Sequence, residues 1–364
     1  MKPTTYFSFY RVAINAIRTT WDKFYLWIFA TFFTLFIGIF LAARGIRMSH
    51  NNGIAGTGTL RIVDNPDVPD NDFFVPGRRF NIRVRHASVT FLDDAMRVVR
   101  SCSIKFSDHY FDSPMDILLN SGKFSVFWSA ISFWKFARLR QERWGVDWVT
   151  YNKNYPKGAL SAQYASRRHA TSFHNVRYHT QSPFLFISTQ GIKYYCKYKV
   201  RPYEDIPETG EDPNPDPRES VNQRILKHET RSRNFLKDEY EARVKEQGAK
   251  YRLQIQFRMA SDDDDPEIFN NMKVWDEERF PWHDIAEFEV NKILDWEEST
   301  KTTFSLNNMP KSLGIIPAKS VYDYNSMNYM RSKTEFARKI RLLHHRLFGY
   351  PKPIPNDDNR NVRE

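Results

Sequence analysis

A single uninterrupted apolar run near the N-terminus constrains this chain of 364 residues more than any other feature. Residues 24–43 read FYLWIFATFFTLFIGIFLAA and contain no charged side chain. As a helix with a rise of about 1.5 Å per residue, the run would be about 30 Å long, which matches the hydrocarbon core of a bilayer. Apolar residues occupy all sides of such a helix, which disfavours a helix lying flat in one leaflet. We therefore predict one transmembrane helix over 24–43, with a buried core helix or a leaflet helix as the alternatives.

The segment before this run, residues 1–23, has a different pattern. Apolar residues recur at helical spacing from Phe9 to Trp21, and no acid precedes Asp22. Such a pattern is typical of a mitochondrial targeting segment or of an amphipathic helix on a membrane surface. Basic residues flank the apolar run on both sides, so the positive-inside rule does not predict its orientation.

The net charge of +11 arises from basic residues that are interleaved with acids in most segments. Nucleic-acid binding would need a concentrated basic face, so we expect no nucleic-acid partner. Attraction to an anionic membrane surface is the better interpretation of the charge. Cys102 and Cys196 lie far apart and do not form a disulfide framework, and the chain has no Asn-x-Ser/Thr sequon. Both facts favour a cytosolic or organelle-interior location for the main domain.

Beyond the apolar run, strand and helix patterns do not alternate regularly. Alternating and β-branched segments predict strands, and longer segments with helical spacing predict helices. The predicted strands cover 57–64, 79–91, 184–202 (two strands around Gln190–Gly191), 250–258 and 284–294, and the predicted helices cover 123–141, 219–247 and 325–349. This order favours an α+β fold with an antiparallel β-barrel core and surrounding helices. We predict one domain over 44–350, followed by a polar tail over 351–364.

Five segments carry a resemblance to a known family. In chain order they are SHNNGIAG (49–56), PGRRFNIRVR (76–85), DDAMRVVRSCSIKF (93–106), the stretch from Asp112 to Trp128, and FSLNNMP (304–310). Together they resemble the haem catalases and their relatives, the catalase-like allene oxide synthases. The first resembles the distal-histidine segment of that family, the fourth the segment with the distal asparagine, and the last the turn before the proximal helix.

The resemblance implies haem as the cofactor and assigns roles around it. His50 would move a proton between the oxygens of a bound peroxide, and Asn120 would orient that peroxide. Ser49 stands where allene oxide synthases have threonine and catalases an apolar residue, which favours an organic hydroperoxide over hydrogen peroxide. Two arginines, Arg47 and Arg100, would pair with the haem propionates. Phe133 would pack on the porphyrin.

Two alignments are open for the proximal iron ligand, which is a tyrosinate in this family. Arg346 to Pro351 reads RLFGYP and matches the family motif literally, which would make Tyr350 the iron ligand and Arg346 its neighbouring arginine. The alternative places Arg331 at the arginine position and Glu335 or Phe336 where the tyrosine should be. In that alignment no phenolate would reach the iron.

Two functional hypotheses follow. The first is a membrane-anchored, catalase-like haem protein that acts on lipid hydroperoxides. The second is a catalase-like accessory subunit that has lost its iron ligand and belongs to a larger membrane complex. Under both hypotheses the lipid bilayer is a partner and the chain is a single-pass membrane protein, with the mitochondrial inner membrane as a possible location. Other subunits of a membrane complex are the expected protein partners.

Overall fold

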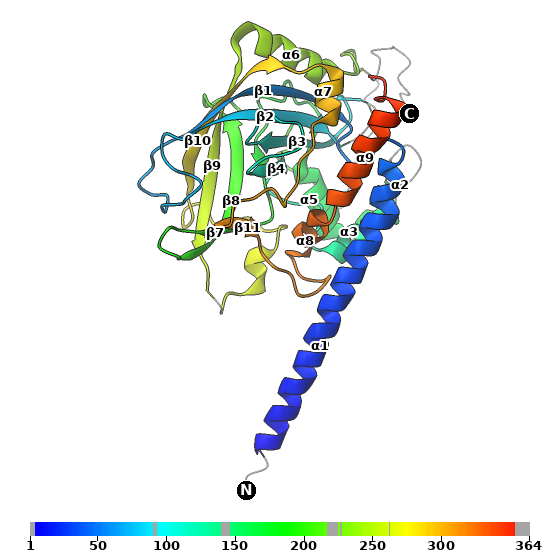
Figure 1. Ribbon diagram of the computed structural model, residues 1–364. Coiled ribbons are helices and arrows are strands. Elements are labelled where there is room, and N and C mark those ends of the chain that lie inside the picture. Colours follow the sequence, from blue (N-terminus) through cyan, green and yellow to red (C-terminus); the bar gives the residue numbers. More distant parts are fainter. Residues whose placement is uncertain are drawn as a thin grey trace.

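A computed structural model describes residues 4–89, 93–139, 146–216, 225, 228–261 and 263–353 of the chain. It has a β-barrel with helices laid around one side and one long N-terminal helix that projects away from it (Figure 1). The barrel strands are β1 (Asn52–Ile62), β2 (Arg79–Ser88), β3 (Val98–Lys105), β4 (Asp116–Ser121), β6 (Tyr178–His179), β8 (Lys193–Pro202), β9 (Ala249–Met259) and β10 (Trp282–Ile293).

These strands form a closed antiparallel ring. Neighbours follow the order β8-β6-β4-β3-β2-β1-β10-β9, and a further pairing of β8 with β9 closes it. Three short strands extend the sheet, namely β5 (Ser166–Arg167) beside β3, β7 (Phe184–Ile187) beside β8, and β11 (Leu313–Ile315) beside β7. The predicted α+β class with an antiparallel barrel core is confirmed.

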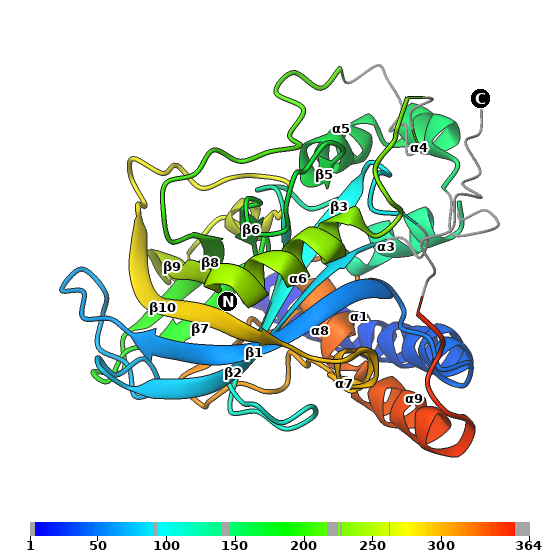
Figure 2. The same ribbon diagram turned by 90° about the horizontal axis from the view of Figure 1, so that it is seen from above.

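The barrel interior holds the main core, and the strand patterns explain why. In β9, Tyr251, Leu253 and Ile255 alternate along the strand and are fully buried, as side chains on one face of a strand must. Helix α6 (Phe235–Gln247) lies across one end of the ring (Figure 2) and adds Tyr240 to the same core. Because closure leaves no long unpaired edge in the ring, the barrel is a stable frame for residues on its outer surface.

The helices agree only in part with the predicted segments. The structure has α3 (Ala130–Ala137), α4 (Trp148–Asn154), α5 (Pro156–Ala165), the 3-10 turn η3 (Pro266–Phe269), α7 (Trp296–Lys301), α8 (Ser326–Ser332) and α9 (Glu335–Phe348). The prediction of one helix over 123–141 was too long, because Ser129 caps α3 at its start. Helices α4 and α5 were not predicted. Part of the predicted helix over 219–247, and the tail from residue 354, lie outside the described residues.

The N-terminal segments that were predicted separately form one rod. It consists of α1 (Thr4–Phe33), a π-helical stretch η1 (Thr34–Ile39) and a last turn α2 (Phe40–Ala42). By length and composition, Ala16–Ala42 is the one described helical stretch that could cross a membrane, a property it shares with signal sequences and buried core helices. Its first half stands clear of the domain (Figure 1), whereas from Leu26 onward one face is buried against the domain.

Candidate functional site

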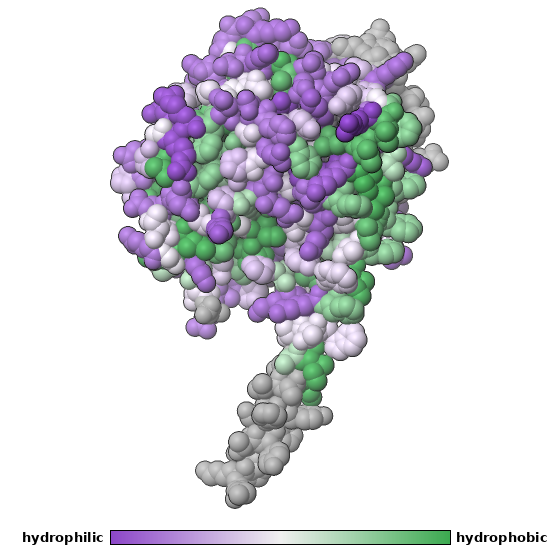
Figure 3. Space-filling view, viewed as in Figure 1, coloured by the Kyte–Doolittle hydropathy of each residue, from purple (hydrophilic) through white to green (hydrophobic). Residues whose placement is uncertain are grey.

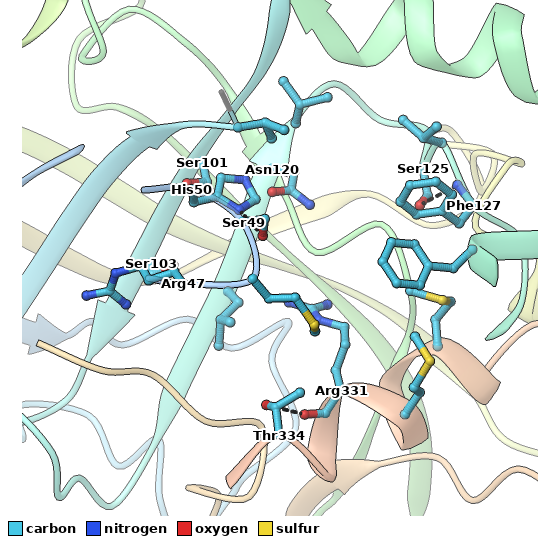
Figure 4. Close-up of a pocket in the computed structure, with 18 of the residues that line it drawn as sticks. Arg47, Ser49, His50, Ser101, Ser103, Asn120, Ser125, Phe127, Arg331 and Thr334 are labelled. Atoms are coloured by element: carbon cyan, nitrogen blue, oxygen red, sulfur yellow. Dashed lines mark hydrogen bonds between the residues drawn. The ribbon is translucent and has the colours of Figure 1, made fainter. Parts of the chain in front are cut away.

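A cavity of about 390 Å³ lies outside the barrel wall, between β2–β4 and the helices α3, α5, α8 and α9. This volume falls in the range of sites that hold a small organic ligand. Figure 4 shows that its labelled polar side chains come from two directions: Ser49, His50 and Asn120 from the strand side, and Arg331 from α8. The rest of the lining is largely aliphatic, aromatic and thioether groups.

His50 is held at the cavity in an unusual backbone conformation. Its φ angle is +59°, a left-handed value that few residues other than glycine adopt. The Arg85 Nη1 group fixes this turn by donating to the His50 carbonyl at 2.9 Å, and Ser49 Oγ lies 2.8 Å from His50 Nδ1. The only other described non-glycine residue with positive φ, Gln181, also lines the cavity. Backbone strain concentrated at one cavity is typical of a functional site.

The His50 imidazole is neutral at physiological pH. Burial, followed by the charges of Arg85, Arg331 and Arg47, lowers the pKa of His50 to about 3, and the Asn120 amide beside the ring opposes this only weakly. The ring nitrogen Nε2 is buried and makes no hydrogen bond of normal geometry to the described residues. The site therefore presents a neutral hydrogen-bonding nitrogen rather than a cation.

The charge on the cavity wall is entirely positive. Five arginines line it and none of its described lining residues is Asp or Glu: Arg47, Arg85, Arg331, Arg338 and Arg341. Four of these guanidinium groups are engaged by neighbouring oxygen atoms. For example, Arg47 Nη2 donates to the carbonyls of Thr300 and Thr302, and Arg338 pairs with Glu335.

Arg331 differs from the other four. Its guanidinium makes only one hydrogen bond to the described residues, a long one from Nη1 to Asn328 Oδ1 at 3.4 Å, and like all of the others except Arg338 it has no described acid as a partner. Burial lowers the pKa of Arg331 to about 10, so the group stays charged at neutral pH. A half-buried guanidinium without a described counter-ion favours an anionic or strongly polar ligand in the cavity.

The structure brings together five of the residues that were predicted for the site: Arg47, Ser49, His50, Asn120 and Phe133 all line the cavity. Arg100 does not. It lies inside the protein, where its guanidinium donates to Ser88 Oγ and to the carbonyls of Asp94 and Met96. These bonds hold β3 against the loop that precedes it, so both terminal nitrogens of the guanidinium are engaged by the protein itself.

The residues of the two proximal-ligand alignments are also apart. Arg346 lies in the last turn of α9 and Tyr350 follows the end of that helix, and neither lines the cavity. The Tyr350 ring packs on His345 with 4.9 Å between centroids. Arg331 does line it, as the second alignment requires. Glu335 accepts from Ser305 and pairs with Arg338, while Phe336 is exposed. The structure therefore has the arginine of the second alignment at the cavity, and none of the described residues that line the cavity is a tyrosine.

Several lining residues were not predicted. Met327 and Met330 on α8 form part of the apolar wall, and Phe33, Thr34 and Gly38 of the N-terminal rod complete it. Sequence spacing did not predict that the rod reaches the cavity, because the rod and α8 are separated in sequence by almost the whole domain. The helical spacing of Met327 and Met330 did indicate that these two side chains lie on one face of a helix.

Comparisons with solved structures agree with the barrel and helices described above. A bacterial catalase structure superposes with a TM-score of 0.63 at 16% identity, covering 87% of this chain and 62% of the catalase. A fungal catalase gives a TM-score of 0.59 at 15% identity, covering 81% and 61%. The chain has a catalase-like fold. No protein-family model matches it.

Two curated proteins resemble this catalase-like chain in sequence. It is 36% identical over 289 residues to the allene oxide synthase-lipoxygenase protein of Plexaura homomalla, and 27% identical over 301 residues to the linolenate 9R-lipoxygenase of Nostoc sp.. The matches cover 78% and 79% of this chain but only 27% and 36% of those proteins. The chain thus spans about a third of the length of the curated relatives it matches.

The residues that line the cavity fit haem only in part. The arginines would suit its carboxylates, and Phe133 would suit its ring. The iron, however, needs an axial ligand, and the described lining has no Tyr or Cys; its one histidine, His50, is the predicted distal residue. No cluster of three or more metal-ligating His, Cys, Asp or Glu residues occurs among the described residues either. A haem held by tyrosinate does not fit this cavity.

Proposed function

We propose that this catalase-like protein binds lipid hydroperoxides in the cavity. The observation that carries the proposal is that one cavity is lined by both a neutral His50 and Arg331, whose guanidinium has a single long hydrogen bond, while much of the remaining lining is apolar. The kinship with a protein named allene oxide synthase-lipoxygenase supports a hydroperoxide of a fatty acid as the ligand class.

The two parts of such a ligand match two parts of the cavity. Arg331 and Asn120 would donate hydrogen bonds to the hydroperoxide group. The group would form one further hydrogen bond with Nε2 of His50. The acyl chain would lie against the aromatic and thioether wall, which includes Phe127, Phe133 and Met330. Because the pKa of His50 is low, the ring acts as a hydrogen-bond partner for the peroxide rather than as a strong base.

Binding can be tested with a C18 fatty-acid hydroperoxide and its reduced hydroxy acid, by titration calorimetry in detergent. Arg331→Leu and Asn120→Leu are each expected to weaken hydroperoxide binding about 10-fold or more, the typical contribution of a charged or buried hydrogen bond. Arg346→Leu, an exposed arginine outside the cavity, is the matched control. Equal affinity of wild type and Arg331→Leu would contradict the proposal.

Haem is not part of this proposal, and that exclusion has its own test. Hemin added to the purified protein is expected to give no stoichiometric Soret band that survives gel filtration. A stable Soret band that is lost in Tyr350→Phe would show that the literal RLFGYP alignment is correct after all. A stable band unchanged in Tyr350→Phe would show another axial ligand.

Anchoring of the chain in a membrane is a second component of the proposal. The apolar rod supports a single-pass or embedded helix, with the lipid bilayer as partner, and lipid hydroperoxides dissolve in that phase. A role as a non-enzymatic accessory subunit of a membrane complex is the second candidate function, and the missing phenolate at the cavity favours it. A mitochondrial inner membrane location stays a prediction.

A further inference from the structure

The apolar rod does not leave the domain in the way a simple membrane tether would. From Leu26 to Ala42 one side of it is buried against α3, α8 and α9, with Ala30 and Phe33 in a cluster that includes Met327. These 17 residues rise about 25 Å, close to the thickness of a hydrocarbon core. If the stretch Ala16–Ala42 enters a bilayer, the face of the domain beside it must enter as well.

Helix α9 lies beside this docked half (Figures 1 and 2) and carries an apolar stripe on its outer side. Phe336, Ile340, Leu343 and Leu347 follow at intervals of four, three and four residues, which places them on one face of the helix. Phe336, Leu343 and Leu347 are 53%, 54% and 64% exposed. In α9 the inner side is the polar one, since Arg341 and His345 are buried there. This arrangement is the reverse of a helix on the surface of a water-soluble protein.

The stripe on α9 continues onto the rod. The outward side chains Phe32, Leu35, Phe36 and Phe40 are exposed along α1, η1 and α2. In the space-filling view, green apolar side chains gather over α9 and down the rod (Figure 3). An exposed apolar surface of this continuity marks an interaction site. We call the outward side chains of these elements the rod–α9 face.

The charges at the edge of the rod–α9 face are basic. Arg44, Lys339 and Arg346 are exposed, and the Arg44 guanidinium lies 4.0 Å from the centroid of the Phe40 ring. Glu335, the one acid of α9, is already paired with Arg338. Long basic side chains beside apolar ones suit a surface at which phosphates overlie acyl chains.

We propose that the rod–α9 face is embedded in the headgroup and upper acyl region of one anionic leaflet, so that the domain sits in the membrane surface rather than beyond it. The proposal rests on the proposed anchoring in one respect only, that the rod enters a bilayer. It also explains the position of the cavity: Thr34 and Gly38 of η1 and Ala337 of α9 line it from within, while their neighbours Leu35, Phe36 and Phe336 point outward. A single layer of helix separates the cavity from the leaflet.

The test uses the full chain in phosphatidylcholine–phosphatidylglycerol vesicles. Cys102 and Cys196 are buried and unpaired, so a cysteine placed on the surface can be labelled selectively with an environment-sensitive fluorophore. Leu347→Cys reports α9, Phe24→Cys reports the free half of the rod, and Met259→Cys, 64% exposed on β9, is the matched control for Leu347. Nitroxide-labelled acyl chains are expected to quench the Leu347 and Phe24 probes several-fold more than the Met259 probe.

Each other outcome overturns a distinct statement. Quenching at Phe24 with the Leu347 probe as open to aqueous iodide as the Met259 probe would refute the embedded α9 and leave the anchor intact. No quenching at either Phe24 or Leu347 would refute the anchor and the embedded face together. A Leu347 probe shielded from iodide without acyl-chain quenching, and with energy transfer between labelled copies, would show that the face binds a second copy of the chain instead. None of these results depends on hydroperoxide binding at the cavity.

Discussion

The two walls of the cavity differ in how closely their residues match the catalase pattern. The strand wall, with Ser49, His50 and Asn120, has the residues that the family resemblance predicts, in mutual reach. The helix wall has Arg331 in place but offers no phenolate from the described residues of α8 and α9. The strand wall thus matches the pattern of the resemblance, whereas the described residues of the helix wall match it only at Arg331.

The reason lies in how each wall is built. The strand wall is fixed by barrel register, in which Ser101 pairs with Asn120 and a slip of one residue would turn every side chain to the opposite face. The helix wall depends on the short break between α8 and α9 at Lys333–Thr334. That break turns Glu335 towards Ser305 and Arg338 and Phe336 towards the outside. A change of strand register would displace many side chains at once, whereas a single substitution on a helix is enough to remove one metal-ligating side chain.

The largest expected effect is on the free energy of unfolding, and it distinguishes Arg100, which stabilises the fold, from Arg331, which lines the cavity. Arg100→Leu removes the donor from Ser88 Oγ and from two buried carbonyls, and is expected to destabilise the protein by about 3–5 kcal/mol. Urea unfolding followed by circular dichroism measures this loss. A loss below about 1 kcal/mol would show that these bonds are not structural and would reopen Arg100 as a ligand-binding residue.

The pH dependence of the free energy of unfolding should show that His50, on the strand wall, is neutral in the folded protein. Its folded pKa of about 3 lies below the ordinary value of 6.5, so below pH 6.5 the unfolded chain binds a proton that the folded protein does not. Stability is thus complete above pH 6.5 and falls as the pH drops towards 3. His50→Asn, which tolerates the left-handed backbone, removes this contribution.

The difference in unfolding free energy between His50→Asn and wild type should change in favour of the variant by about 0.7–1.4 kcal/mol per pH unit below pH 6.5, the lower figure allowing for water in the cavity. Urea titrations at three pH values between 7 and 4.5 give the slope. A difference that is independent of pH would mean that folding does not lower the pKa of His50.

Arg331→Leu should have an effect on stability opposite in kind to that of Arg100→Leu. The Arg331 guanidinium has one weak hydrogen bond and no acid, so its replacement leaves no described acceptor unsatisfied except Asn328 Oδ1. We expect the unfolding free energy to stay within about 1 kcal/mol of wild type or to increase. A loss comparable to that of Arg100→Leu would indicate a structural partner for Arg331 and weaken its assignment to the ligand.

The sequence was a good guide where structure is local and a poor one where it depends on packing. Strict alternation in β9 predicted a strand, and the segment around His50 predicted one wall of the site. The literal RLFGYP match was a weaker guide to position, since α9 continues to Phe348 and carries Tyr350 about 20 Å along the helix from its start. The distance of Tyr350 from the cavity depends on the length and packing of α9, which a match to a short motif does not predict.

The apolar run shows the same limit. Its composition predicted a helix that could cross a membrane, and such a helix is present. Its docking against α8 could not be predicted, because a helix with apolar residues on all sides has no face that marks a protein contact. The isolation of Arg331 was likewise invisible, since it depends on which acids the fold leaves out of reach.

The smallest expected effect on ligand binding concerns Ser49, whose hydroxyl lies 2.8 Å from His50 Nδ1. This contact fixes the orientation of the ring and hence the position of Nε2. Ser49→Ala is expected to weaken hydroperoxide binding about 3- to 10-fold, corresponding to about 0.7–1.4 kcal/mol, with little loss of affinity for the parent fatty acid. Ser49→Thr keeps the hydroxyl and should restore binding. If Ser49→Ala lowers both affinities equally, Ser49 supports the shape of the cavity and does not orient the imidazole.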